Sequence, residues 1–175
     1  MSHISVYIDT NCINSMQKID ALNELEKLND EDKIIIEKTD TLDEELQRGK
    51  GYPKGQKKSI NYIESYGVFV LGQSRLNHAV LGNSQDEDAL TKLLKILWGK
   101  KIRASYTSQE LGDARHIATA SRYGGTYFVT QEKALLDKSE MIEKEFTIKV
   151  ISPDDCLSAV MRRLNELEKI GWSSD

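Results

Sequence analysis

The sequence predicts an α/β fold with three layers, α/β/α, around a mostly parallel central sheet. Short apolar runs alternate along the chain with segments whose apolar residues recur at helical spacing. The runs are apolar almost throughout, which is typical of strands that helices cover on both faces. A length of 175 residues, with 39% hydrophobic and 30% charged residues, suits one domain spanning residues 1–175.

The first half of the chain begins with a predicted buried strand at residues 4–8. Four apolar residues at helical spacing predict a helix over residues 11–28. They are Ile19, Leu22, Leu25 and Leu28. A second strand is expected at residues 33–38. After it, Thr41 and Glu44 match a capping box and predict the start of another helix.

Residues 47–83 are predicted to be a basic insertion that combines a loop with a short helix. The helix is expected at about residues 59–66. Residues 66–71 are interpreted as a strand or a short buried segment. Beyond them, Ser84 and Glu87 match another capping box, and a stripe of leucines behind it predicts an amphipathic helix.

The second half of the chain continues the alternation. Thr107 and Glu110 match a third capping box, and the helix after it is expected to end at the glycines at positions 124 and 125. The remaining predicted elements are that helix at residues 111–123, a strand at 126–129, a helix from about 132, a strand at 146–151 and a final helix with Pro153 at its first position.

Charge and cysteine content narrow the functional classes. There are 28 acidic and 24 basic residues, so a net charge of −4 excludes capture of nucleic acid by a positive field over the whole molecule. No apolar run reaches the ~18 residues of a membrane span, and the first residues lack the pattern of a signal peptide. The two cysteines form neither a disulfide framework nor a zinc site. We therefore expect a cytoplasmic protein with no membrane partner.

Four carboxylates are predicted to meet at one edge of the sheet. Asp9 follows the first strand, and Glu132 follows the strand at residues 126–129. Glu45 and Asp113 lie near the starts of their helices. Ligand sites in open parallel sheets form at the carboxyl ends of the strands. Two like charges ~5 Å apart repel by roughly 3 kcal/mol at an effective dielectric near 20, so clustered acids protonate or bind a cation. Oxygen-only ligation favours Mg²⁺ or Mn²⁺ over zinc.

Each acid also has a local structural interpretation. Asp9 is suited to cap the helix that follows it, and Glu132 to lie at the positive end of a helix dipole. Glu44 is explained by the capping box, which leaves Glu45 as either the free acid or a solvated helix residue. Aspartate inside a helix, as at Asp113, is unfavourable without a further role.

Several segments resemble the motifs of the PIN domain family, in the same order and over most of the chain. They are residues 6–11 (VYIDTN), Glu45-Leu46, residues 112–120 (GDARHIATA) with the following Gly124-Gly125, residues 128–133 (FVTQEK) and residues 150–154 (VISPD). The resemblance implies a PIN-like fold and a metal-dependent endoribonuclease, with Mg²⁺ or Mn²⁺ as cofactor and RNA as substrate.

The same resemblance implies roles for individual residues. The implied catalytic and metal-binding set is Asp9, Glu45, Asp113 and Glu132, with Asn11 and Thr130 as polar residues that line the site. Water activated by one or two metal ions would attack phosphorus. Many relatives of this fold are toxins paired with an antitoxin, others act in RNA processing or decay, and dimers are common. RNA, an antitoxin-like protein and a second copy of the chain are therefore the implied partners.

His116 lies one turn after Asp113. It is interpreted either as a contact for substrate phosphate or, as we favour, as a surface or half-buried helix residue.

Every charged residue between Leu46 and Ile63 is basic. The candidate nucleic-acid contacts are Arg48, Lys50, Tyr52, Lys54, Lys57 and Lys58. A basic arm next to an acidic metal site would offset the repulsion that the site exerts on a phosphodiester backbone, and a tyrosine would stack on an unpaired base. The alternative is a solvated, lysine-rich loop.

Two other functions stay open as alternatives. A non-catalytic PIN-like module would bind RNA or a protein without holding metal. A haloacid-dehalogenase-type phosphatase would use Asp9 as a nucleophile, but that chemistry places a second aspartate two residues later, where this chain has Asn11.

Overall fold

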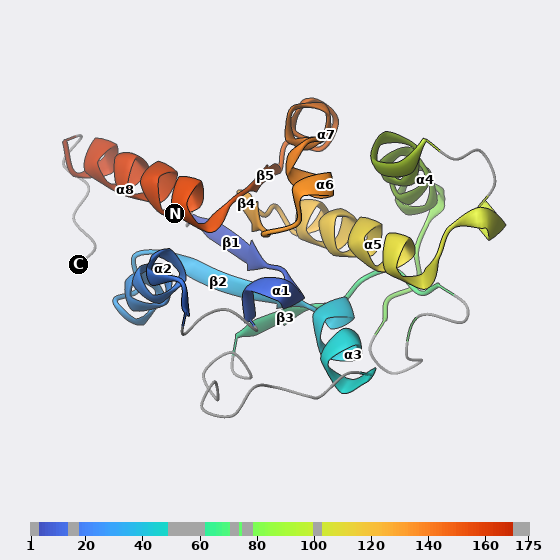
Figure 1. Ribbon diagram of the computed structural model, residues 1–175, viewed down its shortest axis with the longest axis horizontal. Helices are drawn as coiled ribbons and strands as arrows, with labels where there is room; N and C mark the ends of the chain where they lie inside the picture. The colour runs from blue at the N-terminus through green and yellow to red at the C-terminus, as the bar shows by residue number, and fades with distance from the viewer. Residues whose placement is uncertain are drawn as a thin grey trace.

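The computed structural model describes residues 4–13, 18–48, 62–70, 74, 79–99 and 103–169, without the side chains of residues 47, 48 and 103. Five parallel strands form one sheet in the order β3-β2-β1-β4-β5, with helices on both faces (Figure 1). The strands are β1 (Ser5–Ile8), β2 (Ile35–Thr39), β3 (Ile63–Ser65), β4 (Tyr127–Val129) and β5 (Lys149–Ile151). The helices are α1 (Thr10–Ile13), α2 (Asp20–Asp30), α3 (Asp40–Arg48), α4 (Ser84–Trp98), α5 (Ser108–Arg122), α6 (Lys133–Leu136), α7 (Ser139–Phe146) and α8 (Pro153–Lys169). The predicted α/β class is confirmed.

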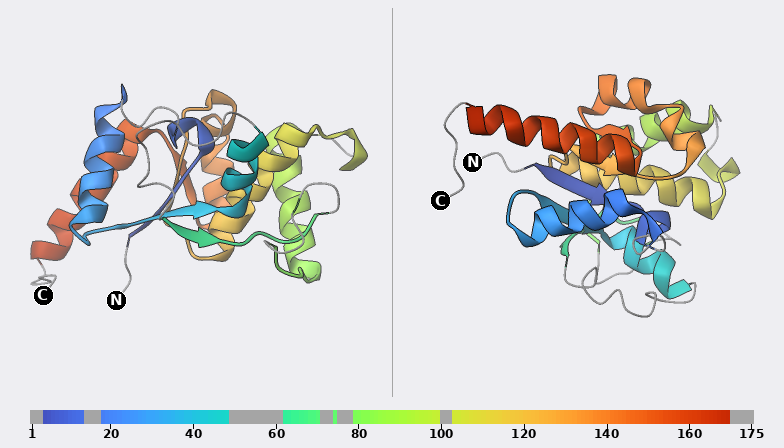
Figure 2. Two further views of the ribbon diagram at one scale, coloured as in Figure 1. Left: turned by 90° about the horizontal axis from the view of Figure 1, so that it is seen from below. Right: turned by 60° about the vertical axis from the view of Figure 1, so that its left-hand side comes forward.

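Two apolar cores lie on opposite faces of the sheet. Because side chains alternate along a strand, Val6 and Ile8 of β1 face one core and Tyr7 faces the other. Helices α2 and α8 cover the first core, and α4, α5 and α7 contribute to the second. Figure 2 shows α2 and α8 side by side on one side of the sheet and α4 and α5 on the other. Among the helices that the structure describes, none is both long enough and apolar enough to cross a membrane.

Parallel pairing brings the carboxyl ends of the strands to one edge of the sheet. The residues that directly follow β1 and β4 still bond to the neighbouring strand. The backbone N–H of Asp9 donates to the carbonyl of Val129 at 2.9 Å, and that of Thr130 donates to Ile151 at 3.1 Å. Asp9 and Thr130 are therefore held by the sheet itself, at neighbouring positions on its edge.

Several predicted elements are present with small shifts at their ends. The strands expected at residues 4–8, 33–38 and 126–129 correspond to β1, β2 and β4. The capping box of α5 is confirmed, because the Thr107 side chain accepts from the Glu110 backbone and the Glu110 side chain accepts from the Thr107 backbone. Gly124, at a φ of 76°, follows the end of α5 in a conformation that glycine adopts without strain.

Two predicted elements have different bounds in the structure. The helix expected over residues 11–28 is not continuous, because Ile19 is extended at φ −120° and ψ 110° and precedes α2. The other three apolar residues of the predicted helix, Leu22, Leu25 and Leu28, lie in α2. The strand expected at residues 146–151 is shorter, because Phe146 ends α7 and Thr147 adopts a left-handed conformation. The strand β5 therefore begins only at Lys149.

Two predicted capping boxes were wrong by one or two residues. Helix α3 already begins at Asp40, so Thr41 lies inside it, and the hydroxyl of Thr39 accepts from the backbone N–H of Leu42 at 3.4 Å. Helix α4 is capped by Asn83 and Asp86, whose side chains and backbones bond reciprocally, one residue before the predicted box. Asn and Ser are about equally good caps, so overlapping boxes cannot be ranked from sequence.

The helix predicted at residues 59–66 is contradicted in its described part. Residues 63–65 instead form β3, which pairs in parallel with β2 at the edge of the sheet. The Tyr62 side chain packs into the core beside α2, and its hydroxyl donates to Glu26 at 2.9 Å. In the segment that follows, Val68 makes a single bridge to Val80 and Val70 is buried, which matches the short buried segment rather than a strand. Part of the expected insertion thus belongs to the sheet.

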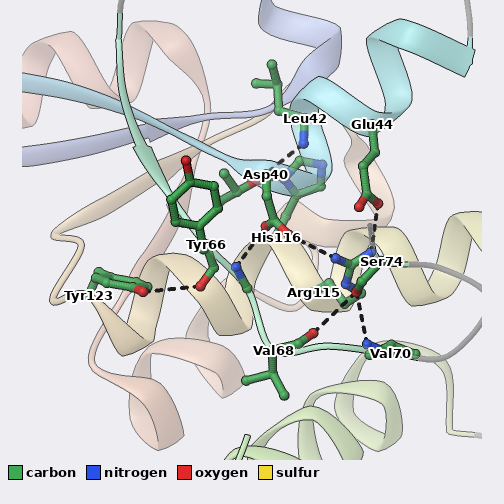
Figure 3. Close-up of polar contacts among 12 residues, drawn as sticks. Asp40, Leu42, Glu44, Tyr66, Val68, Val70, Ser74, Arg115, His116 and Tyr123 are labelled. Carbon is green, nitrogen blue, oxygen red and sulfur yellow. Dashed lines mark hydrogen bonds and ion pairs between the residues drawn. The ribbon is translucent and has the colours of Figure 1, made fainter. Parts of the chain in front are cut away.

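A buried ion-pair network joins α3 to α5. Arg115, 3% exposed, pairs with Asp40 and with Glu44 at 3.1 Å each (Figure 3). Asp40 also accepts from the backbone N–H of Gly67 at 2.9 Å, which fixes the segment after β3. Buried charges are tolerated only when they are paired, so this arginine links three parts of the chain near the sheet edge.

Replacing Arg115 with leucine should lower the free energy of unfolding by about 3–5 kcal/mol, because two buried carboxylates lose their cation. Urea denaturation measures the difference. The matched control is Lys133→Gln, which removes the exposed pair between Lys133 and Asp137, and it should change stability by less than about 0.5 kcal/mol. Similar small effects for both variants would contradict this role of Arg115.

Candidate metal centre

The four predicted acids come together at one cavity of about 390 Å³ at the carboxyl edge of the sheet. Asp9 directly follows β1, and Glu132 directly precedes α6. Glu45 lies in α3 and Asp113 in α5. The lining residues are Asp9, Thr10, Asn11, Thr41, Glu44, Glu45, Ser108, Gln109, Gly112, Asp113, Arg115 and Glu132.

Asp9 is buried and held by three hydrogen bonds. The backbone N–H of Thr10, the first residue of α1, donates to Asp9 Oδ1 at 2.7 Å. The Asn11 amide and the Thr130 hydroxyl each donate to its Oδ2 at 2.6 Å. The structure thus places both predicted polar residues directly against Asp9, whose carboxylate is locked in one orientation.

Thr130 connects the loops that follow β1 and β4. Besides donating to Asp9, its hydroxyl accepts from the backbone N–H of Glu132 at 3.0 Å and from the Asn11 amide at 3.1 Å. The Gln131 backbone N–H donates to Asn11 Oδ1 at 3.2 Å. Glu132 precedes α6 without a side-chain capping bond, and its carboxylate lines the cavity.

Glu44 and Glu45 have separate roles in α3. Consecutive helical residues point about 100° apart, and although both line the cavity, the Glu44 carboxylate pairs with Arg115 while that of Glu45 lies with Asp9 and His116. The Thr10 hydroxyl donates to Glu45 Oε2 at 2.6 Å. A Cβ added at Gly112 would come within 2.8 Å of Glu45 Oε1, so the glycine of α5 leaves the space that this carboxylate occupies.

Asp113 is buried with an unsatisfied oxygen. Among the residues that the structure describes, its Oδ2 finds no hydrogen-bond partner. Burial, followed by the charge of Glu132, raises the pKa of Asp113 to about 8, and His116 offsets only part of this. A buried carboxylate without a partner is costly in its ionised form, so this position favours either a proton or a bound cation.

His116 contradicts the interpretation that we favoured, because its ring is 1% exposed. The Nδ1 atom lies 2.6 Å from the hydroxyl of Thr39, the last residue of β2. The Nε2 atom lies 3.5 Å from Glu45 Oε2, and one ligand atom each of Asp9, Glu45 and His116 lie within 4.8 Å of one another. The three-residue spacing of Asp113 and His116, which puts both on one helix face, was the available signal.

Electrostatic coupling shapes the charge of the centre. Burial, reinforced by Glu45, raises the pKa of Asp9 despite the opposing effect of His116. Burial also raises the pKa of Glu132, with Asp9 adding to the effect. Burial opposes ionisation of Glu45, but the attraction of His116 outweighs it and lowers the pKa of Glu45 to about 2. Burial opposes ionisation of His116 as well, and the neighbouring carboxylates nevertheless raise its pKa.

The predicted nucleic-acid contacts lie largely beyond the structural description. Arg48 is the last residue of α3, and its side chain is not described. The other candidates, Lys50, Tyr52, Lys54, Lys57 and Lys58, lie outside the described residues.

No protein-family model matches this chain, and no curated protein matches it either. Function is therefore inferred from the cavity, its side chains and their charges.

Replacing Asp113 with asparagine should stabilise the metal-free protein, and the gain should grow with pH. A carboxyl whose folded pKa is raised costs little below pH 4 and progressively more as pH rises toward about 8. Thermal melts with a chelator should show a Tm increase of roughly 5 °C or more near pH 8 and little change near pH 4.

The matched control is Glu45→Gln, because the pKa of Glu45 is shifted downward. This variant should lower Tm between pH 5 and 8, since the ionised side chain is stabilised there by His116. A pH-independent Tm difference for Asp113→Asn would contradict the burial argument.

Proposed function

We propose that this chain is a PIN-like ribonuclease that hydrolyses RNA phosphodiester bonds with Mg²⁺ or Mn²⁺ held by Asp9, Glu45, Asp113 and Glu132. One observation carries the proposal: four carboxylates from distant parts of the chain line a single cavity. Their mutual repulsion is relieved when a divalent cation binds between them.

The side chains fit a hard divalent ion. Carboxylate oxygens are the ligands that Mg²⁺ and Mn²⁺ prefer. The unpartnered Oδ2 of Asp113 offers a buried lone pair that no described protein donor uses. Asp9 keeps further lone pairs beside the three hydrogen bonds that orient it. When bound, such an ion stabilises negative charge that develops at phosphorus and makes water a better nucleophile.

The protein side chains supply preorganisation around the reacting phosphate. Asn11 and Thr130 fix the Asp9 carboxylate in advance, so it does not have to reorient when charge develops nearby. Ser108 and Gln109 line the same cavity in the first turn of the 15-residue helix α5. The positive end of that helix dipole favours a phosphate on the side of the cavity that Ser108 and Gln109 line.

RNA as the substrate rests on the resemblance to the PIN family and on the run of basic residues after Glu45. The phosphatase alternative gains no support, because Asn11 donates its amide to Asp9 and offers no carboxyl to protonate a leaving group. The non-catalytic alternative differs from the proposed nuclease because it would not bind metal, and metal binding is directly measurable.

Purified protein should cleave labelled single-stranded RNA in the presence of Mn²⁺ or Mg²⁺ and stop when a chelator is added. Asp9→Asn and Asp113→Asn should each reduce the cleavage rate by at least about 100-fold, because each removes charge from the proposed cation site. The control is Glu166→Gln, an exposed residue of α8, which should cleave like the unmodified protein. Equal cleavage by all four proteins would mean that the activity comes from a contaminant.

Titration calorimetry with Mn²⁺ separates the enzyme from the non-catalytic module. We expect binding in the micromolar to low millimolar range, with heat that disappears in Asp9→Asn. Absence of binding at millimolar Mn²⁺, in protein shown to be folded, would favour the non-catalytic module.

The basic segment should control the salt dependence of RNA binding. Changing Lys50, Lys54, Lys57 and Lys58 together to glutamine should raise KM roughly tenfold at physiological salt and leave kcat near its original value. The slope of log affinity against log salt should become shallower by about 0.7 for each phosphate that a lysine no longer neutralises. An unchanged slope would indicate a solvated loop that does not touch the substrate.

A further inference from the structure

His116 is a buried imidazole whose ring lies against two of the carboxylates of the proposed cation site, Asp9 and Glu45. Its ring is 1% exposed, and its Nε2 has no hydrogen-bond partner among the residues that the structure describes. This atom faces Asp9 and Glu45 instead of solvent or an apolar wall. A buried ring nitrogen with no hydrogen bond is costly unless something else occupies its lone pair or its proton.

The opposite side of the ring has a partner that can hold the other proton. Nδ1 lies 2.6 Å from the Thr39 hydroxyl at the end of β2. When Nδ1 carries the proton and donates it to Thr39, the lone pair of Nε2 points at the carboxylates. Histidines that bind metals are held in this way, with the second ring N–H donated to a fixed acceptor.

The separations are compatible with one shared ion. Ligand atoms about 2.1 Å from an ion lie about 3.0 Å apart at a right angle and about 4.2 Å apart in line. His116 Nε2 and Glu45 Oε2 are 3.5 Å apart, within this range. The full group of Asp9, Glu45 and His116 spans at most 4.8 Å, so a small side-chain adjustment suffices to place all three on one cation. Asp113, three residues before His116, presents its carboxylate from the same face of α5.

We infer that His116 Nε2 is a ligand of the cation, so that the centre is a mixed nitrogen–oxygen site that selects a first-row divalent transition ion over Mg²⁺. The inference rests on the proposed metal site and adds the identity of its ion. Imidazole is a good ligand for transition ions, whereas Mg²⁺ favours a shell of oxygens and retained waters. Thr39 is then a positioning residue, because it acts on the ion only through the ring of His116.

Pulsed electron paramagnetic resonance of the Mn²⁺-loaded protein tests the inference directly. The chain has three histidines, at positions 3, 78 and 116, so the double variant His3→Gln/His78→Gln retains only His116. Its Mn²⁺ spectrum should show coupling to a ¹⁴N nucleus, and the coupling should vanish when His116→Gln is added. The double variant keeps His116 itself, so a misfolded His116 variant would not obscure the result.

Calorimetry with Mn²⁺ and with Mg²⁺ provides the second measurement. We expect His116→Gln and Thr39→Val each to weaken Mn²⁺ binding about 10–100-fold and to leave Mg²⁺ binding within about threefold. Mn²⁺ binding without ¹⁴N coupling in the double variant would overturn the inference, would indicate that His116 is only a counter-charge for Glu45, and would leave the proposed nuclease intact. No Mn²⁺ binding at all would overturn both.

Discussion

Repulsion among carboxylates confined at one edge of the sheet is the constraint on which the rest of the structure depends. The fold brings four acids to one cavity and compensates three of them in different ways. Asp9 receives three hydrogen bonds, and Glu45 lies beside His116. The pKa of Asp113 is raised to about 8, so this carboxyl group is protonated at neutral pH when no cation is bound. Such an arrangement has a deficit of positive charge, and a divalent cation is the species that removes it most simply.

The neighbouring Arg115 network shows the opposite solution in the same two helices. Asp40 and Glu44 are buried, as Asp9 and Asp113 are, but an arginine of the protein pairs with both of them. Helices α3 and α5 thus carry two sites side by side: a closed site, in which Arg115 pairs with its acids, and an open site, the cavity, in which the four acids have no arginine or lysine partner among the described residues. The closed site contributes rigidity, because breaking it would leave charges buried without a partner. The open site gains precision from that rigidity, since Glu45 follows Glu44 in the same helical turn.

The parallel sheet explains why the centre lies where it does. Residues that follow β1 and β4 are adjacent because these strands are paired, and Thr130 joins their loops by hydrogen bonds to Asp9, Asn11 and Glu132. Polar groups fixed by a sheet reorganise little when charge appears beside them. This property is what the proposed chemistry on a charged phosphodiester requires. The apolar packing below, on both faces of the sheet, supplies the stability that the uncompensated carboxylates remove.

Sequence alone determined the α/β class, the order of most strands and helices, and the acids that follow strand ends, because apolar periodicity and capping are local properties of the chain. Asp9 was predictable in this way. Tertiary structure decided that Glu45 joins Asp9 and His116 while Glu44 pairs with Arg115. It also decided that residues 63–65 pair as an edge strand and that His116 is buried among acids. Those outcomes depend on which face of α3 meets α5 and on which segment reaches β2. Contacts between distant segments set them, and spacing along one segment carries no information about the partner opposite.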